Sequence, residues 1–152
     1  MSRKAGRILA FQGLYSWDAG GMSKDEVLTL SWPKDDKEES EDETSESQKQ
    51  SSEPDMETAT FARILIAGTI DNHEQIDELI KENLKGWDFD RVNKVTLAVL
   101  RLSVYCLLFQ KEVEAPVVIN EAIEIVKKYG QDEAFKFVNG VLDKINKKIQ
   151  SA

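Results

Sequence analysis

Residues 95–109 read VTLAVLRLSVYCLLF, and this stretch carries most of the information about the fold. It contains one charged residue, Arg101, and its apolar residues occupy every face of a helix with 3.6 residues per turn. A helix that is apolar all round is a buried helix, and the run is shorter than the roughly 20 apolar residues that a bilayer span needs. We therefore predict an all-α, compact single-domain bundle of about six to seven helices around a buried central helix.

Arg101, in the middle of this apolar run, admits two interpretations. In the first, its stem packs in the core while its head reaches a carboxylate or the surface. In the second, its head emerges at a binding face. The pattern of residues favours neither interpretation over the other.

Helical periodicity continues on both sides of the central run. The predicted helices cover residues 3–18, 24–30, 57–84, 116–129 and about 132–150, and residues 71–73 are a candidate bend in the longest of them. Gly86 is expected to end that helix, with Trp87 and Phe89 as anchors beyond it. The sequence contains no β-hairpin signal, internal repeat or transmembrane segment.

The acidity of the chain comes from one segment. The 152 residues carry a net charge of −8, and residues 34–57 alone hold eleven acids and three lysines, so the rest of the chain is neutral. Residues 34–55 contain no hydrophobic side chain that could offset the entropy of ordering. We predict one domain over residues 1–152, interrupted by a disordered acidic loop at 34–56, and the chain's overall acidity does not exclude nucleic-acid binding.

The remaining composition indicates a cytoplasmic protein without catalysis. The single cysteine, Cys106, lies in the central run, which excludes a disulfide within the chain and predicts a buried, inert thiol. The basic N-terminus lacks the apolar core of a signal peptide. His73 has no second histidine or cysteine nearby, and the sequence contains no Gly-rich phosphate loop or nucleophile motif. We expect no cofactor, no metal and no catalytic residue.

The last predicted helix combines an aromatic side chain with lysines. Its core stripe, at about 100° per residue, consists of Ala134, Phe135, Val138, Val141, Leu142, Ile145 and Ile149. Phe137 falls outside this stripe, near Lys136 and Lys144, and aromatic faces among cations stack bases and hold phosphates. Alternatively, Phe137 packs under a neighbouring helix and the lysines only solvate the surface. The first helix adds three bases at its start, Arg3, Lys4 and Arg7.

Several stretches together resemble the NusB family of bacterial transcription antitermination factors. They are FQGLYSW at 11–17, VLRLSVYCLL at 99–108, INEAIEIVKKYG at 119–130 and FVNGVLDKI at 137–145. The resemblance implies a small all-α fold that binds the boxA element of ribosomal RNA leader transcripts. It also implies a partner, the small-subunit ribosomal protein NusE, and action with RNA polymerase in processive transcription.

Carried over by position, the resemblance places Arg7, Arg101, Lys136 and Phe137 at the RNA. It places Tyr15 at the protein partner. With the other bases, the candidate RNA-binding set is Arg3, Lys4, Arg7, Arg101, Lys136, Phe137 and Lys144. The resemblance favours the second interpretation of Arg101, with Glu121 as its candidate ion-pair partner. Two departures are the long acidic segment and Cys106, which stands where the family usually has a glutamate.

Two other functions compete with antitermination. One is an RNA-binding helical module like that preceding methyltransferase domains that act on ribosomal RNA, but these 152 residues contain no Gly-rich cofactor domain. The other is a pure protein-interaction bundle in which the lysines are inert. A homodimer is an alternative form of assembly.

Overall fold

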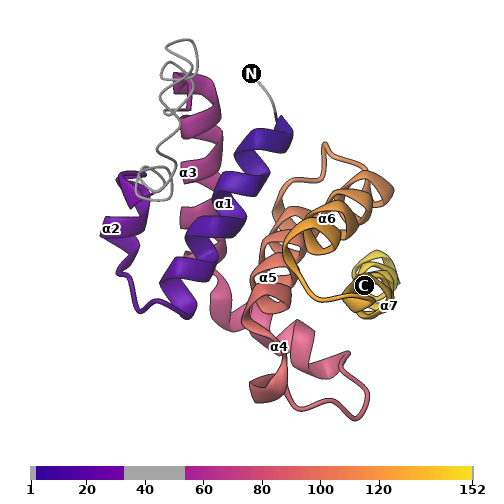
Figure 1. Cartoon of the computed structure of the whole chain (residues 1–152). Helices are drawn as coiled ribbons and strands as arrows, with labels where there is room; N and C mark the ends of the chain where they lie inside the picture. The colour runs from indigo at the N-terminus through magenta and orange to yellow at the C-terminus, as the bar shows by residue number, and fades with distance from the viewer. Residues whose placement is uncertain (1–2, 33–53, 152) are drawn as a thin grey trace.

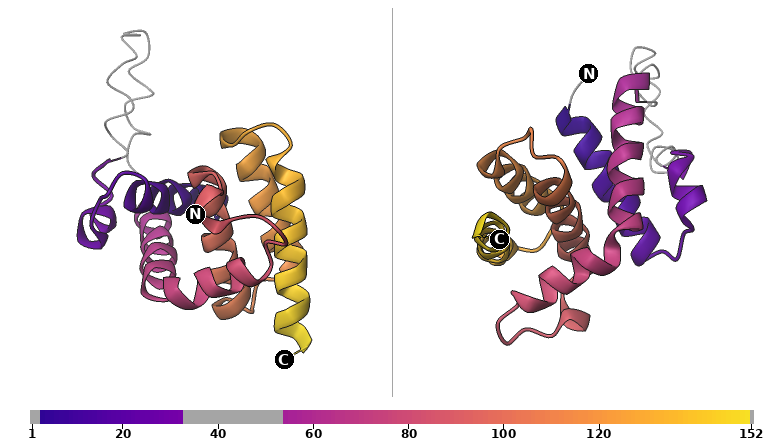
Figure 2. Two further views of the ribbon diagram at one scale, coloured as in Figure 1. Left: turned by 90° about the horizontal axis from the view of Figure 1, so that it is seen from below. Right: turned by 180° about the vertical axis from the view of Figure 1, so that it is seen from behind.

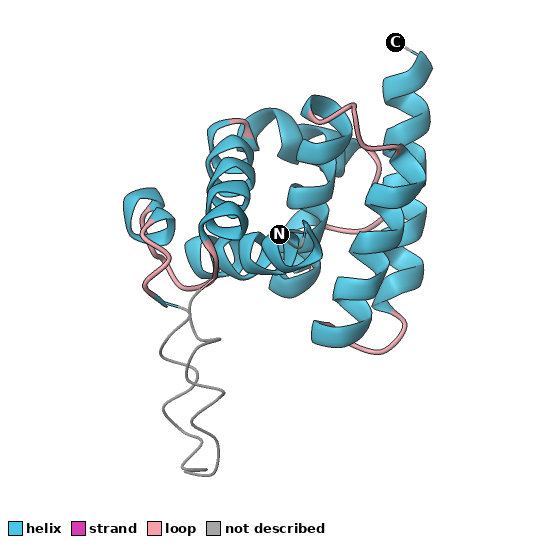
Figure 3. Ribbon diagram, turned by 90° about the horizontal axis from the view of Figure 1, so that it is seen from above, coloured by secondary structure: helices cyan, strands magenta, loops and turns pink. Residues whose placement is uncertain are grey.

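The computed structural model describes residues 3–32 and 54–151, which form seven α-helices, one short 3-10 helix and no strand (Figure 1). The elements are α1 (Arg3–Asp18), α2 (Lys24–Leu28), α3 (Met56–Asp71), α4 (His73–Glu82), η3 (Phe89–Arg91), α5 (Lys94–Phe109), α6 (Ala115–Tyr129) and α7 (Ala134–Ser151). The prediction of an all-α bundle of six to seven helices is confirmed. Short loops join most of these helices (Figure 3).

Helix α5 is the buried centre of the molecule, as its apolar sequence predicts. It contacts α1, α3, α4, α6 and α7, and side chains along its length, such as Leu97, Leu100 and Val104, are almost completely buried. Asn93 begins the helix by accepting hydrogen bonds from the backbone N–H groups of Val95 and Thr96. No helix of the described ranges is long and apolar enough to cross a membrane.

Five of the other helices form two groups on either side of α5, and α4 contacts α3, α5 and α7 (Figure 2). On one side α1 packs against α3, and α2 packs against both; on the other side α6 packs against α7. Gly68 of α3 allows the first group to approach α5 closely, because a Cβ at this position would lie 2.3 Å from the ring of Tyr105. Because glycine has no Cβ, the ring of Tyr105 can lie against the backbone of α3 at this position.

Several predicted helix boundaries differ from the structure. Ser23 caps α2 as expected for a serine at this position, but the helix ends at Leu28, before Leu30, whose φ of 55° is incompatible with a helix. The predicted 57–84 helix is two helices that meet at Asn72, the site of the expected bend. The second of them ends at Glu82, before the predicted last residue Leu84 and well before Gly86.

The predicted anchors beyond α4 behave differently from each other. Phe89 is half-buried against the core, whereas Trp87 is 62% exposed, so the prediction that Trp87 is an anchor is wrong. Asp88 caps η3 by accepting a hydrogen bond from the backbone N–H of Asp90.

The predicted acidic loop at 34–56 lies outside the described residues, except for its last three positions. Those three belong to the start of α3, because Asp55 is the N-cap, accepting a hydrogen bond from the backbone N–H of Thr58, and Met56 is the first helical residue.

Arg101 joins three helices inside the protein. Its Nε and Nη2 atoms donate hydrogen bonds to the two carboxylate oxygens of Asp77 on α4, at 2.8 and 3.1 Å, and its Nη1 donates to Asp18 of α1 at 2.9 Å. The side chain is nearly buried, and both carboxylates are largely covered. Burial on its own would lower the pKa of Arg101, but the hydrogen bond to Asp77 and the charges of Asp77 and Asp18 raise it overall.

The first interpretation of Arg101 is therefore the one that the structure has. Its head reaches carboxylates in the interior and does not emerge at a binding face. The expected pairing with Glu121 is wrong, because the partners come from α1 and α4, whereas Glu121 belongs to α6.

We predict that Arg101→Met destabilises the fold by about 3–5 kcal/mol, because it leaves two covered carboxylates without their cation. The free energy of unfolding in urea measures this loss. Lys24→Ala is the matched control, since it removes an exposed ion pair with Asp71 and should cost no more than about 1 kcal/mol. Equal effects of the two substitutions would show that Arg101 is not a structural centre.

Candidate nucleic-acid interface

Helix α7 presents its apolar stripe to the core and leaves Phe137 at the edge of that stripe. Val138, Val141, Leu142 and Ile145 are buried, which confirms the predicted core face. Phe137 is half-buried, and its ring meets the indole of Trp87 in an edge-to-face arrangement, with centroids 5.4 Å apart and planes inclined at 61°. The ring thus contacts the loop that carries Trp87 besides packing against the core, and part of it remains accessible.

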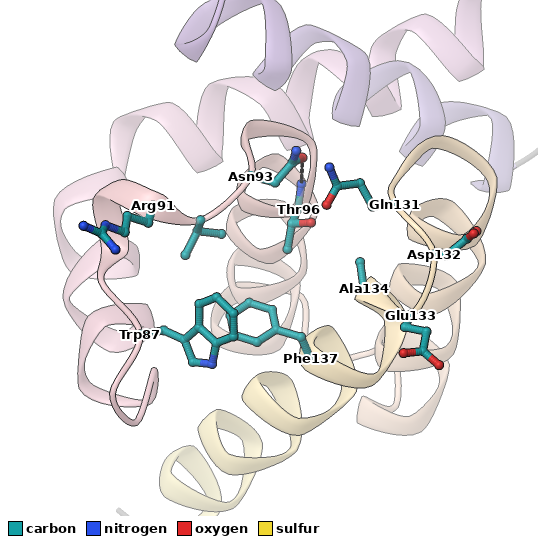
Figure 4. A pocket seen from close by; sticks show the side chains of 10 residues that line it. Trp87, Arg91, Asn93, Thr96, Gln131, Asp132, Glu133, Ala134 and Phe137 are labelled. Carbon is teal, nitrogen blue, oxygen red and sulfur yellow. Dashed lines mark hydrogen bonds between the residues drawn. The ribbon is translucent and has the colours of Figure 1, made fainter.

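A cavity of about 420 Å³ opens beside this aromatic pair (Figure 4). Its walls come from the segment that leads into α5 and from the start of α7. The lining residues are Trp87, Arg91, Val92, Asn93, Thr96, Gln131, Asp132, Glu133, Ala134 and Phe137. The charged side chains drawn in Figure 4 point outward from the rim, while the Gln131 amide extends toward Thr96.

Lysines lie near the end of α6 and along α7. Lys136 is exposed, with its Nζ 3.4 Å from a carboxylate oxygen of Glu133, and Lys127 of α6 lies over the ring of Phe135 at 4.6 Å from the centroid. Lys144 follows Phe137 along α7 and is half-buried. The two helices therefore bring Lys127 and Lys136 to the same end of the bundle as Phe137.

The start of α1 contributes further cations next to α6. Lys4 lies 3.6 Å from Glu124, which is one helical turn before Lys127, so α1 continues the row of lysines on α6. Arg3 is exposed and covers the ring of Phe61 at 4.9 Å. This ring fits beneath α1 because Gly6 has no Cβ, which would lie 2.5 Å from it. Three helices, α1, α6 and α7, thus bring cations onto neighbouring parts of the surface.

Arg7 does not share the exposure of its two neighbours. Only 6% of the residue is exposed, its guanidinium lies 5.8 Å from the centroid of Phe61, and its Nε is buried without a hydrogen-bond partner. The prediction that Arg7 and Arg101 offer cations to RNA is therefore not supported by their positions, since both are buried. The two arginines are therefore not part of the exposed cationic surface.

Cys106 is buried beside Arg7, in agreement with the expected inert thiol. Burial raises the pKa of Cys106 to about 11, although the nearby charge and hydrogen bond of Arg7 oppose this shift. The thiol therefore remains protonated at neutral pH. Within the described residues, no group of three or more His, Cys, Asp or Glu side chains could hold a metal ion.

Tyr15 lies at the other end of α1 and is 40% exposed. Within the same turn, Asp18 accepts hydrogen bonds from Lys94 and from Arg101. The aromatic side chain is therefore presented from a rigid part of the bundle, separate from the basic start of the helix.

Sequence reasoning did not identify two surface residues, Trp87 and Lys127. Trp87 was expected to be an anchor, and only the exposed loop between α4 and η3 reveals it as a surface aromatic. Lys127 belongs to a helix whose polar face looks ordinary in sequence, and its contact with Phe135 depends on how α6 and α7 pack. The periodicity of α7 did identify Phe137.

We define the cationic–aromatic surface as Arg3, Lys4, Trp87, Lys127, Lys136 and Phe137. Accessible aromatic rings among cations are a common way for proteins to stack bases and hold phosphates of single-stranded nucleic acid. The chain belongs to the NusB family, whose model matches residues 4–147.

Individual relatives support the same assignment. The chain is 43% identical to the transcription antitermination protein NusB of Treponema denticola, over 97% of this chain and 98% of that protein. Its structure superposes on T. maritima NusB with a TM-score of 0.75 and 30% identity, covering 97% and 92% of the two chains. A crystal structure of the antitermination factors NusB and NusE in complex with dsRNA gives a TM-score of 0.75 at 29% identity, covering 96% of each chain.

Proposed function

We propose that this protein is a transcription antitermination factor that binds a boxA-type RNA together with the ribosomal protein NusE and promotes processive transcription by RNA polymerase. The observation that carries the proposal is the set of exposed lysines at the end of α6 and the start of α7, the helix that carries the half-buried ring of Phe137, with Lys4 of α1 beside Glu124 of α6. The protein acts by binding, without catalysis, in the cytoplasm.

Electrostatics and stacking have different roles in this proposal. Lys4, Lys127 and Lys136 hold phosphates, which gives affinity for RNA of any sequence. Phe137 stacks on a base that has left its helix, which restricts the site to single-stranded RNA. Arg3 extends the phosphate contacts along α1, and Lys144 extends them along α7.

Tyr15 contacts NusE in this proposal. Its exposed ring lies at the end of α1 opposite to Arg3 and Lys4, so protein and RNA occupy different ends of the helix. A NusB relative was crystallised in complex with NusE and dsRNA. This complex supports the proposal that a chain of this fold binds protein and RNA at the same time.

A phosphate role for the lysines predicts a specific salt dependence. Lys127→Ala and Lys136→Ala should each weaken the binding of RNA equally for every sequence. Each should also reduce the slope of log K against log salt concentration by about 0.7. Phe137→Ala should weaken binding by about 1–3 kcal/mol through lost stacking and leave that slope unchanged. Fluorescence anisotropy with a short single-stranded boxA-type RNA, from low to high salt, measures both quantities.

Lys24→Ala is the control, because it removes an equally exposed lysine from α2, on the other side of α5. It should leave both affinity and slope at the wild-type values. Identical slopes for all four variants would rule out phosphate contacts by Lys127 and Lys136.

The NusE contact is tested by Tyr15→Asp. A buried charge at an interface is costly, so the variant should lose most of its affinity for NusE, while its circular dichroism and its affinity for RNA alone stay at wild-type values. Co-elution of the variant with NusE, unchanged from wild type, would place the partner elsewhere.

A further inference from the structure

We propose that the cavity beside Trp87 and Phe137 is a slot for one unpaired nucleobase, with Trp87 as the ring on which the base stacks. The inference rests on the proposed RNA binding and adds to it a second aromatic residue and a pocket for the hydrogen-bonding edge of the base. It therefore locates the part of the surface that reads a nucleotide, beyond the part that holds phosphates.

The two rings are arranged to receive a flat ligand. They meet edge to face at 61°, and the part of the Trp87 indole that Phe137 does not cover is open to a flat ligand. Trp87 is 62% exposed, whereas the other two tryptophans of the chain are partly buried against the core. Its indole is the largest exposed aromatic surface beside the cavity, and indole faces are effective stacking platforms for bases.

The cavity also has three uncharged polar side chains that suit a base rather than a phosphate, whereas its charged residues, Arg91, Asp132 and Glu133, point outward from the rim. Asn93, Thr96 and Gln131 supply amide and hydroxyl groups that both donate and accept, as the edge of a base requires. The oxygen of Asn93 already caps α5, so its amide nitrogen is the atom left to donate to a ligand. Figure 4 shows Gln131 reaching toward Thr96 across the cavity.

The rim of the pocket carries charges of both signs. Arg91 points away from the rings on one side, and Asp132 and Glu133 point outward on the other (Figure 4). The Nζ of Lys136 lies 3.4 Å from a carboxylate oxygen of Glu133, so Arg91 and Lys136 are the cations available to the phosphates on either side of an inserted base. A volume of about 420 Å³ is at the small end of ligand pockets, which suits one base with its sugar and not a protein helix.

The loop that carries Trp87 is held in place from both sides. Lys85 and Gly86 adopt left-handed conformations, with φ of 30° and 80°, and the backbone N–H of Trp87 donates to the carbonyl of Leu84. Two residues later, the ring of Phe89 packs against the guanidinium of Arg101, whose Cζ lies 5.7 Å from the ring centroid. The indole is therefore presented from an anchored turn, which lowers the entropic cost of stacking.

The test is a double-mutant cycle between Trp87 and single nucleotides of a short boxA-type RNA. Trp87→Ala should weaken binding of the intact RNA on the order of 5- to 150-fold, and Trp87→Phe, which keeps a ring, by much less. In a series of RNAs with one abasic nucleotide each, one position should abolish the difference between Trp87→Ala and wild type. That position identifies the base in the slot.

Ile64→Ala is the matched control, because it removes another exposed apolar side chain, on α3 and away from the slot. If wild type binds the RNA and Trp87→Ala binds it equally well, the slot is wrong while the proposed function stands. If wild type does not bind the RNA, both fall. If Trp87→Ala weakens only the complex with NusE, Trp87 belongs to a protein contact and the nucleobase slot is refuted.

Discussion

The bidentate pairing of Arg101 with Asp77, completed by Asp18, is the interaction on which the arrangement of the helices depends. The three side chains come from α5, α4 and α1, so a single guanidinium ties α1 and α4 to the central helix. The rings of Trp17 and Phe89 cover the guanidinium, with centroids 5.5 and 5.7 Å from the Cζ of Arg101. A buried charge of this kind contributes more to a unique arrangement than to net stability, because its desolvation offsets much of the attraction.

This pairing also links the core to the proposed RNA surface. Phe89 contacts the guanidinium and lies two residues from Trp87, so the position of the exposed indole follows from the position of a buried arginine. Arg101 thus acts on binding through the loop and not through a phosphate. The same distinction holds for Arg7, whose guanidinium lies beside Phe61 and Cys106 in the interior.

Periodicity predicts those parts of the structure that depend on neighbours in sequence. It identified α5 as the buried helix, α7 as amphipathic and Phe137 as a residue off the core stripe. It could not choose between the two interpretations of Arg101, because Asp77 and Asp18 are 24 and 83 residues away in sequence. The positional resemblance to the family favoured the wrong one, since position alone does not show whether a side chain is buried. Trp87 was misjudged because a large aromatic in a loop is usually an anchor, and only tertiary structure shows its exposure.

In the proposed complex RNA binds the cations of α1, α6 and α7 and the rings of Trp87 and Phe137, while Arg101 is a structural residue in the interior. Backbone and arginine side-chain NMR during titration with single-stranded boxA-type RNA tests it most directly. We expect the largest shift changes in residues 3–6, 85–93, 127–128 and 133–140, with α2 and α3 nearly unchanged and the Arg101 Nε–H signal retained. Large changes along α2 and α3, or loss of the Arg101 signal to direct contact with RNA, would contradict the account.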